Sequence, residues 1–209
     1  IVSGDFYWVF ERGAYLYVAV SDCTGHGVPG AFLTMLGMSF LNEIMTSVDQ
    51  LSPAAVLDQL REKFIRELGK TGTRDGMDIS LIRVNKKTKE FQWSGALRPL
   101  LVLRKDAQKT EIIQGDRQSI CFVENQNPFT NIEGTLENGD TVYLFSDGYA
   151  DQFGGERGKK FKMKQLVSLL TSLNNQPMEM QKKALASSFE EWKAGFEQID
   201  DVCVFGIKF

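Results

Sequence analysis

An aspartate that ends an apolar strand and enters a glycine-rich turn is the feature that most constrains this chain. Residues 14–20 (AYLYVAV) are typical of a buried strand, and Asp22 follows within SDCTGHGVPGA over 21–31. Glycine carries no side chain and accepts positive φ, so such a turn brings the backbone close to a ligand. Pro29 fits the first turn of a helix that continues to about Thr46. The segment predicts a strand, a turn with a carboxylate at its start, and a long helix.

Four acidic sites each stand next to an apolar, strand-like run: Asp5, Asp22, Asp147 and the pair Asp200 and Asp201. Each aspartate alone is explained by a turn, where its side chain bonds nearby backbone amides. All four together favour a shared site. Carboxylate and carbonyl oxygens suit Mg²⁺ or Mn²⁺, whereas zinc usually takes His and Cys ligands. The sequence therefore predicts a hard-metal site at strand ends.

The first two predicted strands form a β-hairpin. Residues 6–10 and 14–20 are joined by a short connection that contains Gly13. Antiparallel pairing of these strands brings Asp5 and Asp22 to the same end of the hairpin. A shared metal site requires this geometry, although any hairpin with polar ends also shows it.

The rest of the pattern is not the regular strand–helix alternation of a doubly wound fold, and it favours antiparallel sheets with outer helix layers. Further strands are predicted over 78–84, 90–95, 100–104, 112–113, 120–123 and 141–146, and further helices over 53–68, 162–172 and 177–193. The helix over 29–46 is apolar nearly all round, which predicts burial. The last strand, 202–209, is apolar enough to lie centrally in a sheet. Asp75 and Asp78 are accessory ligands or strand-start residues.

Together the acidic motifs resemble those of SpoIIE-type protein serine/threonine phosphatases, the bacterial branch of the metal-dependent type 2C phosphatases. The matching segments run in the family's order along all 209 residues: Ser3 to Tyr7, Asp22 to Ala31, Ser146 to Gly148, and Asp200 with Asp201. The resemblance implies one phosphatase domain over 1–209. It also implies an α+β fold, a four-layer α-β-β-α sandwich of two mainly antiparallel sheets flanked by helices.

The resemblance further implies two ions, Mn²⁺ or Mg²⁺, and a role for each acidic residue. Asp22 would bridge both ions, and the backbone carbonyl of Cys23 would ligate one of them. Asp147 and Asp200 would hold the other ion, with Asp201 as the second choice to Asp200, and Asp5 would act through a bound water. Asp22 and Asp147 would thus take part in catalysis through a water that the ions activate.

Three further residues are candidates, two of them with an alternative reading. His26, the only histidine, is a candidate catalytic residue. It lies four residues after Asp22, where other type 2C branches place a histidine two residues after the bridging aspartate, so structuring the turn is the alternative. Arg98, in a GALRP segment that also resembles the family, is a candidate for binding an anionic substrate. Arg157 is a second such candidate, with surface solvation as the alternative.

Composition indicates which classes of partner and which cellular compartment are expected. A net charge of −3 gives no basic field, so we expect no nucleic-acid partner. Three scattered cysteines form no CxxC pair, which favours a reducing, cytoplasmic setting. We find no signal peptide and no apolar run of transmembrane length.

The start of the sequence suggests a truncated domain. There is no initiator Met, and family members place another strand before the Ser3-Gly4-Asp5 motif. We therefore expect the first strand to be missing. The parent protein is expected to carry an upstream sensor or regulatory domain, or a membrane anchor. A missing edge strand leaves sheet hydrogen bonds unpaired, which favours a homodimer through that edge.

The sequence predicts hydrolysis of phosphoserine or phosphothreonine on a bacterial regulatory protein in signal transduction. The resemblance implies a STAS-type anti-anti-sigma protein as the phosphoprotein substrate, and hence a role in sigma-factor regulation. One alternative is a catalytically silent phosphatase fold that serves as a binding or regulatory module, because a fold does not guarantee chemistry. Another is a two-metal enzyme with a different substrate, such as a nuclease or a small-molecule phosphatase.

Overall fold

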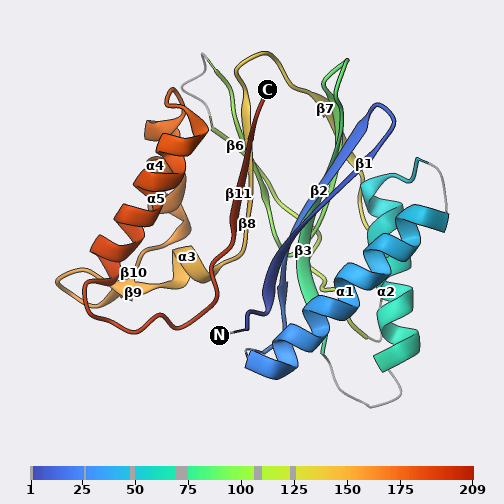
Figure 1. The fold of residues 1–209 in the computed structure, drawn as a ribbon, viewed down its shortest axis with the longest axis horizontal. Coiled ribbons are helices and arrows are strands. Elements are labelled where there is room, and N and C mark those ends of the chain that lie inside the picture. The colour runs from blue at the N-terminus through green and yellow to red at the C-terminus, as the bar shows by residue number, and fades with distance from the viewer. Residues whose placement is uncertain (1, 26, 48–49, 69–74, 106–109, 123–125) are drawn as a thin grey trace.

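Two antiparallel sheets lie between two layers of helices (Figure 1). The computed structural model describes residues 2–25, 27–47, 50–68, 75–105, 110–122 and 126–209. Sheet A has the order β1-β2-β3-β4-β7, formed by Asp5–Arg12, Tyr15–Cys23, Met77–Asn85, Glu90–Ala96 and Ile132–Thr135. Sheet B has the order β11-β8-β5-β6, formed by Val204–Lys208, Thr141–Phe145, Leu100–Leu103 and Thr110–Ile113. The predicted α+β four-layer sandwich is confirmed.

The helices form the two outer layers. Figure 1 shows α1 (Gly27–Ser47) and α2 (Pro53–Leu68) over sheet A, and α4 (Met163–Leu173) and α5 (Met178–Lys193) over sheet B. The segment after Asp147 contains a short helix, α3 (Gly148–Asp151), and a small hairpin of β9 (Phe153–Gly154) and β10 (Lys159–Lys160). Four helices were predicted close to these bounds, whereas α3 and the small hairpin were not.

Alternation along the strands divides the apolar side chains between separate cores, because successive residues of a strand point to opposite faces. On β2, Val18 and Val20 join the core between the sheets, while Tyr17 and Ala19 join the core under α1 and α2. A third core lies between sheet B and α4 and α5. The inner strands of each sheet, such as β5 and β8, are therefore buried on both faces.

One face of α1 is exposed, which corrects the prediction that the whole helix is buried. Its buried side packs in the core under α1 and α2, whereas Val28, Phe32 and Met35 are 76%, 59% and 73% exposed. The reason is that α1 lies in an outer layer, with protein on one side only.

With 21 residues and a mean hydropathy of 1.2, α1 is also long and apolar enough to cross a bilayer by length and composition alone, contrary to our reading of the sequence.

The last strand, β11, lies at the edge of sheet B among the described strands, so the prediction of a central strand is wrong. It pairs only with β8. Its apolar residues have another cause, since Phe205 and Ile207 pack in the core between the sheets and Val204 packs under the helices. A strand that is covered on both faces is apolar throughout even where one edge is open.

Asp140 ties the turn before β8 to the end of β5. Its buried carboxylate accepts hydrogen bonds from Arg104 Nη1 at 2.8 Å and from the backbone N–H groups of Lys105 and Glu137 at 3.0 and 2.9 Å. The pKa of Asp140 is lowered, because these donors and the charge of Arg104 outweigh the opposing effect of burial.

We expect Asp140→Asn to lower the free energy of unfolding by about 2 kcal/mol near neutral pH, since hydrogen bonds to a charged group contribute roughly 1.5–3 kcal/mol. The folded pKa lies below the unfolded value of about 3.9. The stabilisation is therefore present above that value and is lost as pH falls through the folded pKa. Urea unfolding of both proteins across this range measures the difference. A difference that does not shrink in acid would contradict this assignment.

Candidate metal centre

Three carboxylates stand side by side at one end of sheet A. Asp5 of β1 lies opposite Asp22 of β2, and Asp22 lies opposite Asp78 of β3. Directly opposite residues of an antiparallel pair share a face. This face also carries Val18 and Val20 into the core between the sheets. The apolar core between the sheets therefore ends in a row of carboxylates, and the predicted approach of Asp5 to Asp22 is confirmed.

Sheet B contributes Ser146 and Asp147, which directly follow β8. Ser146 Oγ donates a short hydrogen bond to the Asp5 carboxylate and accepts one from the Cys203 N–H at 3.0 Å. Asp147 stands at the start of α3. Ser146 thus joins β1 of one sheet to the residues that follow β8 and precede β11 in the other. We call the side chains of Asp5, Asp22, Asp78 and Asp147 the carboxylate cluster.

The pair Asp200 and Asp201 reaches the cluster through close backbone contacts. Asp201 Oδ2 accepts the Gly4 N–H at 2.8 Å, and Asp200 Oδ1 accepts the Asp201 N–H at 2.9 Å. A Cβ on Gly148 would lie 1.9 Å from the Asp201 carbonyl oxygen, so only glycine fits beside this turn. Each carboxylate of the pair accepts one backbone N–H, and the choice of Asp200 over Asp201 as the ligand stays a prediction.

Arg98 lies in the middle of these carboxylates. Its Nη2 is 2.7 Å from Asp22 Oδ2 and 3.2 Å from Asp78 Oδ2, and its Nη1 is 2.8 Å from Asp147 Oδ2. Burial lowers the pKa of Arg98, but the carboxylates of Asp147 and Asp22 outweigh burial and raise it. The predicted contact of Arg98 with an anionic substrate stays a prediction, because the structure pairs this residue with acidic side chains.

Burial and neighbouring carboxylates raise the pKa values of two acids in the cluster. Burial raises the pKa of Asp5 to about 7, with a further contribution from the Asp200 carboxylate. Burial raises the pKa of Asp22 to about 8; Arg98 opposes this shift, and the carboxylates of Asp5 and Asp147 add to it. Burial and carboxylate repulsion both penalise the charged form of an acid. A bound divalent cation would relieve this repulsion.

The oxygen atoms present fit a hard divalent cation. Asp147 Oδ1 is buried and has no hydrogen-bond partner among the described residues, as expected of an oxygen that is available to a metal. The neighbouring groups are carboxylates, which Mg²⁺ and Mn²⁺ prefer. As the described side chains are arranged, no three acidic, His or Cys side chains enclose a metal position. Arg98 contacts Asp22 and Asp147 at once.

The other predicted site residues have different outcomes. Cys23 is the last residue of β2, and its N–H donates to the Gly4 carbonyl at 3.2 Å; the role of its own carbonyl as a metal ligand stays a prediction. Arg157 is exposed between β9 and β10, and no described carboxylate of the cluster pairs with it. His26 lies outside the described residues, and its role stays a prediction.

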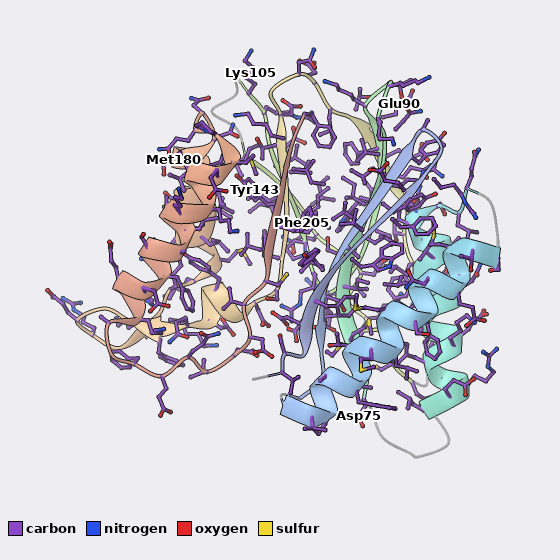
Figure 2. All side chains as sticks on the ribbon, in the orientation of Figure 1. Asp75, Glu90, Lys105, Tyr143, Met180 and Phe205 are labelled. Atoms are coloured by element: carbon purple, nitrogen blue, oxygen red, sulfur yellow. The ribbon has the colours of Figure 1, made fainter. Side chains whose placement is uncertain are left out.

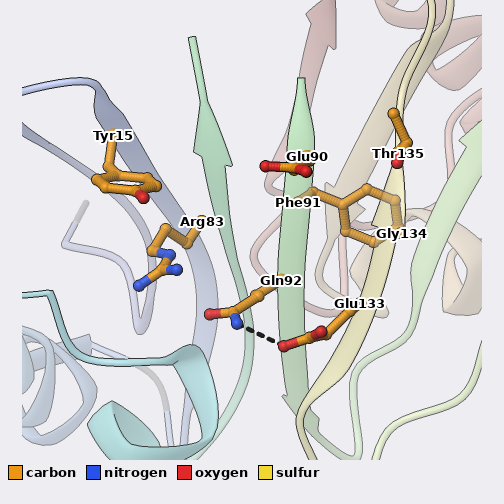
Figure 3. Close-up of a pocket in the computed structure, with 8 residues that line it drawn as sticks. All are labelled: Tyr15, Arg83, Glu90, Phe91, Gln92, Glu133, Gly134 and Thr135. Carbon is orange, nitrogen blue, oxygen red and sulfur yellow. Dashed lines mark hydrogen bonds between the residues drawn. The ribbon is translucent and has the colours of Figure 1, made fainter. Parts of the chain in front are cut away.

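A polar pocket of about 440 Å³ lies at the opposite end of sheet A (Figure 3). Tyr15 and Arg83 line it, as do Gln92 and Glu133, which share a hydrogen bond at 2.6 Å. Tyr15 begins β2, whereas Asp22 stands near its other end. Figure 2 shows the same separation, with Asp75 at one end of the molecule and Glu90 at the other. The pocket is therefore distinct from the carboxylate cluster.

Comparisons with known proteins identify the family and the fold. Residues 12–209 match the family of Stage II sporulation protein E (SpoIIE). None of the curated proteins matches the chain in sequence. Among solved structures, the SiaA-PP2C domain of Pseudomonas aeruginosa is 30% identical with a TM-score of 0.91, over 100% of this chain and 81% of that one.

Two less similar structures share the fold. One contains the PP2C phosphatase domain of SpoIIE from Bacillus subtilis with a fragment of its regulatory domain, at 18% identity and a TM-score of 0.77, over 100% of this chain and 57% of that one. The other is RsbX in complex with magnesium, at 14% identity and a TM-score of 0.70, over 99% of this chain and 87% of that one. On the family match and the 30% identical relative, the chain belongs to the SpoIIE family of PP2C-type protein serine/threonine phosphatases.

Proposed function

We propose that this domain hydrolyses phosphoserine or phosphothreonine on a bacterial regulatory protein, with two Mn²⁺ or Mg²⁺ ions. The observation that carries the proposal is the convergence of Asp5, Asp22 and Asp147 from two sheets onto one cluster. Family membership gives this cluster its chemistry, and the magnesium complex of the structural neighbour RsbX supports the choice of metal.

The proposed ligands are Asp22, Asp147, Asp200 and the carbonyl of Cys23, with Asp5 acting through a water. When bound, the two ions would lower the pKa of a water and compensate charge on the phosphoryl group. Ser146 orients Asp5 through its hydrogen bond, and Asp201 holds Gly4 next to it. Burial raises the pKa of the Cys23 thiol to about 12, so this thiol stays protonated and is a poor nucleophile.

The proposed substrate is a phosphorylated STAS-type anti-anti-sigma protein, on the strength of the family to which the chain belongs. The net charge of −3 disfavours nucleic acid. A catalytically silent binding module is the second candidate, and one observation favours it: Arg98 pairs with two of the proposed ligands. Activity measurements separate these candidates.

We expect phosphate release from a phosphoserine STAS protein to require Mn²⁺ or Mg²⁺ and to stop in EDTA. Asp147→Asn should lower kcat/KM by about 100-fold or more, because loss of metal-site residues typically costs at least 10–100-fold. Glu62→Gln, a change to an exposed carboxylate of α2, is the control and should leave the rate unchanged.

Parallel assays use a phosphotyrosine peptide and a nucleotide. Faster turnover of either would assign the two-metal chemistry to another substrate class. Calorimetric Mn²⁺ binding without hydrolysis of any of the three substrates would favour the silent module.

We also propose that an upstream regulatory region of a longer protein acts on the site through α1. The start of α1 touches the site, since Thr34 Oγ1 donates to the Gly4 carbonyl at 2.9 Å, beside Asp5. A Cβ on Gly30 would lie 2.4 Å from the Gly25 carbonyl, in the turn after Asp22. The exposed apolar residues Val28 and Phe32 offer such a region a surface on the same helix.

We expect Thr34→Val to weaken Mn²⁺ binding several-fold, on the order of 1 kcal/mol for one lost hydrogen bond, because α1 then no longer holds the Gly4 carbonyl. Thr46→Val is the matched control. Among the described residues, Thr46 Oγ1 donates to backbone carbonyls of its own helix, at Asn42 and Glu43. Calorimetry of both variants gives the dissociation constants. Equal constants for Thr34→Val and wild type would argue against coupling through α1.

Setting and assembly remain proposals. Three cysteines that are scattered along the sequence and form no CxxC pair support a reducing, cytoplasmic setting. Among the described strands, β1 and β11 are sheet edges, and an unpaired edge supports a homodimer. Sedimentation of the protein over a range of concentrations tests the dimer, and a monomer throughout would exclude it.

A further inference from the structure

We propose that Arg98 is the internal cation of the carboxylate cluster and competes with metal ions for Asp22 and Asp147. This inference rests on the proposed function, since it concerns the same carboxylates. Its test measures metal affinity and stability, so that it does not depend on knowing the substrate.

The guanidinium of Arg98 joins the two sheets. Its Nη2 contacts Asp22 Oδ2 of sheet A at 2.7 Å, and its Nη1 contacts Asp147 Oδ2, at the end of β8 in sheet B, at 2.8 Å. The planar fork of arginine suits two carboxylates at once, which a lysine ammonium does not match. The Arg98 side chain is only 14% exposed, so water screens these pairs weakly.

The backbone places Arg98 at this point. It lies between β4 and β5, where the chain passes from sheet A to sheet B. Leu97 has φ of 59°, and its N–H donates to the Asp116 carbonyl at 2.9 Å. A non-glycine residue at positive φ persists when its surroundings determine its conformation. A Cβ on Gly95 would lie 2.4 Å from the Arg98 carbonyl, which further restricts the turn.

Competition follows from charge and from shared oxygen atoms. Asp22 and Asp147 are proposed metal ligands, and one oxygen of each already accepts from Arg98. A divalent cation and a guanidinium repel each other at these separations, most strongly where water is excluded. Arginine cannot relieve the repulsion by losing a proton. Metal binding therefore requires Arg98 to withdraw from at least one of these carboxylates.

Asp78 provides Arg98 with a partner that is not a proposed metal ligand. Its Oδ2 lies 3.2 Å from Arg98 Nη2, and its Oδ1 accepts from Ser119 Oγ at 2.6 Å. Ser119 thus fixes Asp78 beside the cluster. Arg98 keeps one paired carboxylate when it withdraws from Asp22 and Asp147, and so remains next to the site.

Calorimetric titration of the metal-free protein with Mn²⁺ tests the proposal. We expect Arg98→Gln to lower the Mn²⁺ dissociation constant by about tenfold, within the usual range of coupling between two ligands. Arg98→Lys keeps the charge but loses the fork, so it should lower the constant by a smaller factor. Arg66→Gln, at an exposed arginine paired with Glu67, is the matched control and should bind Mn²⁺ as wild type does.

Thermal unfolding gives a second measurement that also detects misfolding. In EDTA, Arg98→Gln should lower Tm, because three carboxylates lose their shared partner. Saturating Mn²⁺ should restore most of this loss, since tighter binding to the folded state adds more stability.

Three outcomes overturn the proposal. A folded Arg98→Gln variant with unchanged or weaker Mn²⁺ affinity shows that Arg98 does not compete. If Arg98→Lys binds Mn²⁺ with the affinity of wild type, the positive charge alone explains the effect of Arg98, and direct competition for the carboxylate oxygens is excluded. Absence of Mn²⁺ binding in wild type and in all variants overturns the metal centre itself, and so the proposed function together with this inference.

Discussion

The crowding of half-buried carboxylates at one end of the two sheets is the constraint on which the rest of the site depends. Asp5, Asp22 and Asp78 lie in one row of sheet A, and Asp147 faces them from sheet B. In a low-dielectric environment such a group is costly unless cations or proton uptake compensate it. Arg98 supplies one positive charge, which opposes the rise in the pKa of Asp22 that burial, the largest effect, and the neighbouring carboxylates cause. The cluster is therefore well suited to bind further cations.

The register of the strands in sheet A determines where these carboxylates lie. Because side chains alternate between the faces of a strand, a shift of one residue in β2 would turn Asp22 toward the helices and break its row with Asp5 and Asp78. The apolar residues Val18 and Val20 prevent the shift, since both must face sheet B. The core between the sheets thus positions the carboxylates that follow it along the same strand. Stability and site geometry depend on the same pairing.

Much of the fold could be predicted from local sequence signals, because hairpins and amphipathic helices depend on neighbouring residues. Features set by distant parts of the chain could not. The strand β7 was missed, and residues 120–123 were predicted as a strand although Ile120 forms only an isolated bridge with Met77. The outward face of α1 and the edge position of β11 depend on which layer covers each element. The apolar composition of an element does not show which of its faces or edges another layer covers.

The site shows the same division between local and distant causes. Asp5 and Asp22 could be identified as site residues from the sequence, because they stand at the ends of predicted strands. The place of Asp78 beside Asp22 becomes clear only when β3 is paired in register with β2. The sequence could have predicted this pairing, since Asp78 starts a strand that was predicted. Arg98 differs, because its distance to Asp147 depends on how the turn after β4 crosses to sheet B. Arg98, which the sequence suggested as a substrate contact, thereby lies among the proposed metal ligands. In the proposal above, its positive charge lowers the affinity of the site for metal ions.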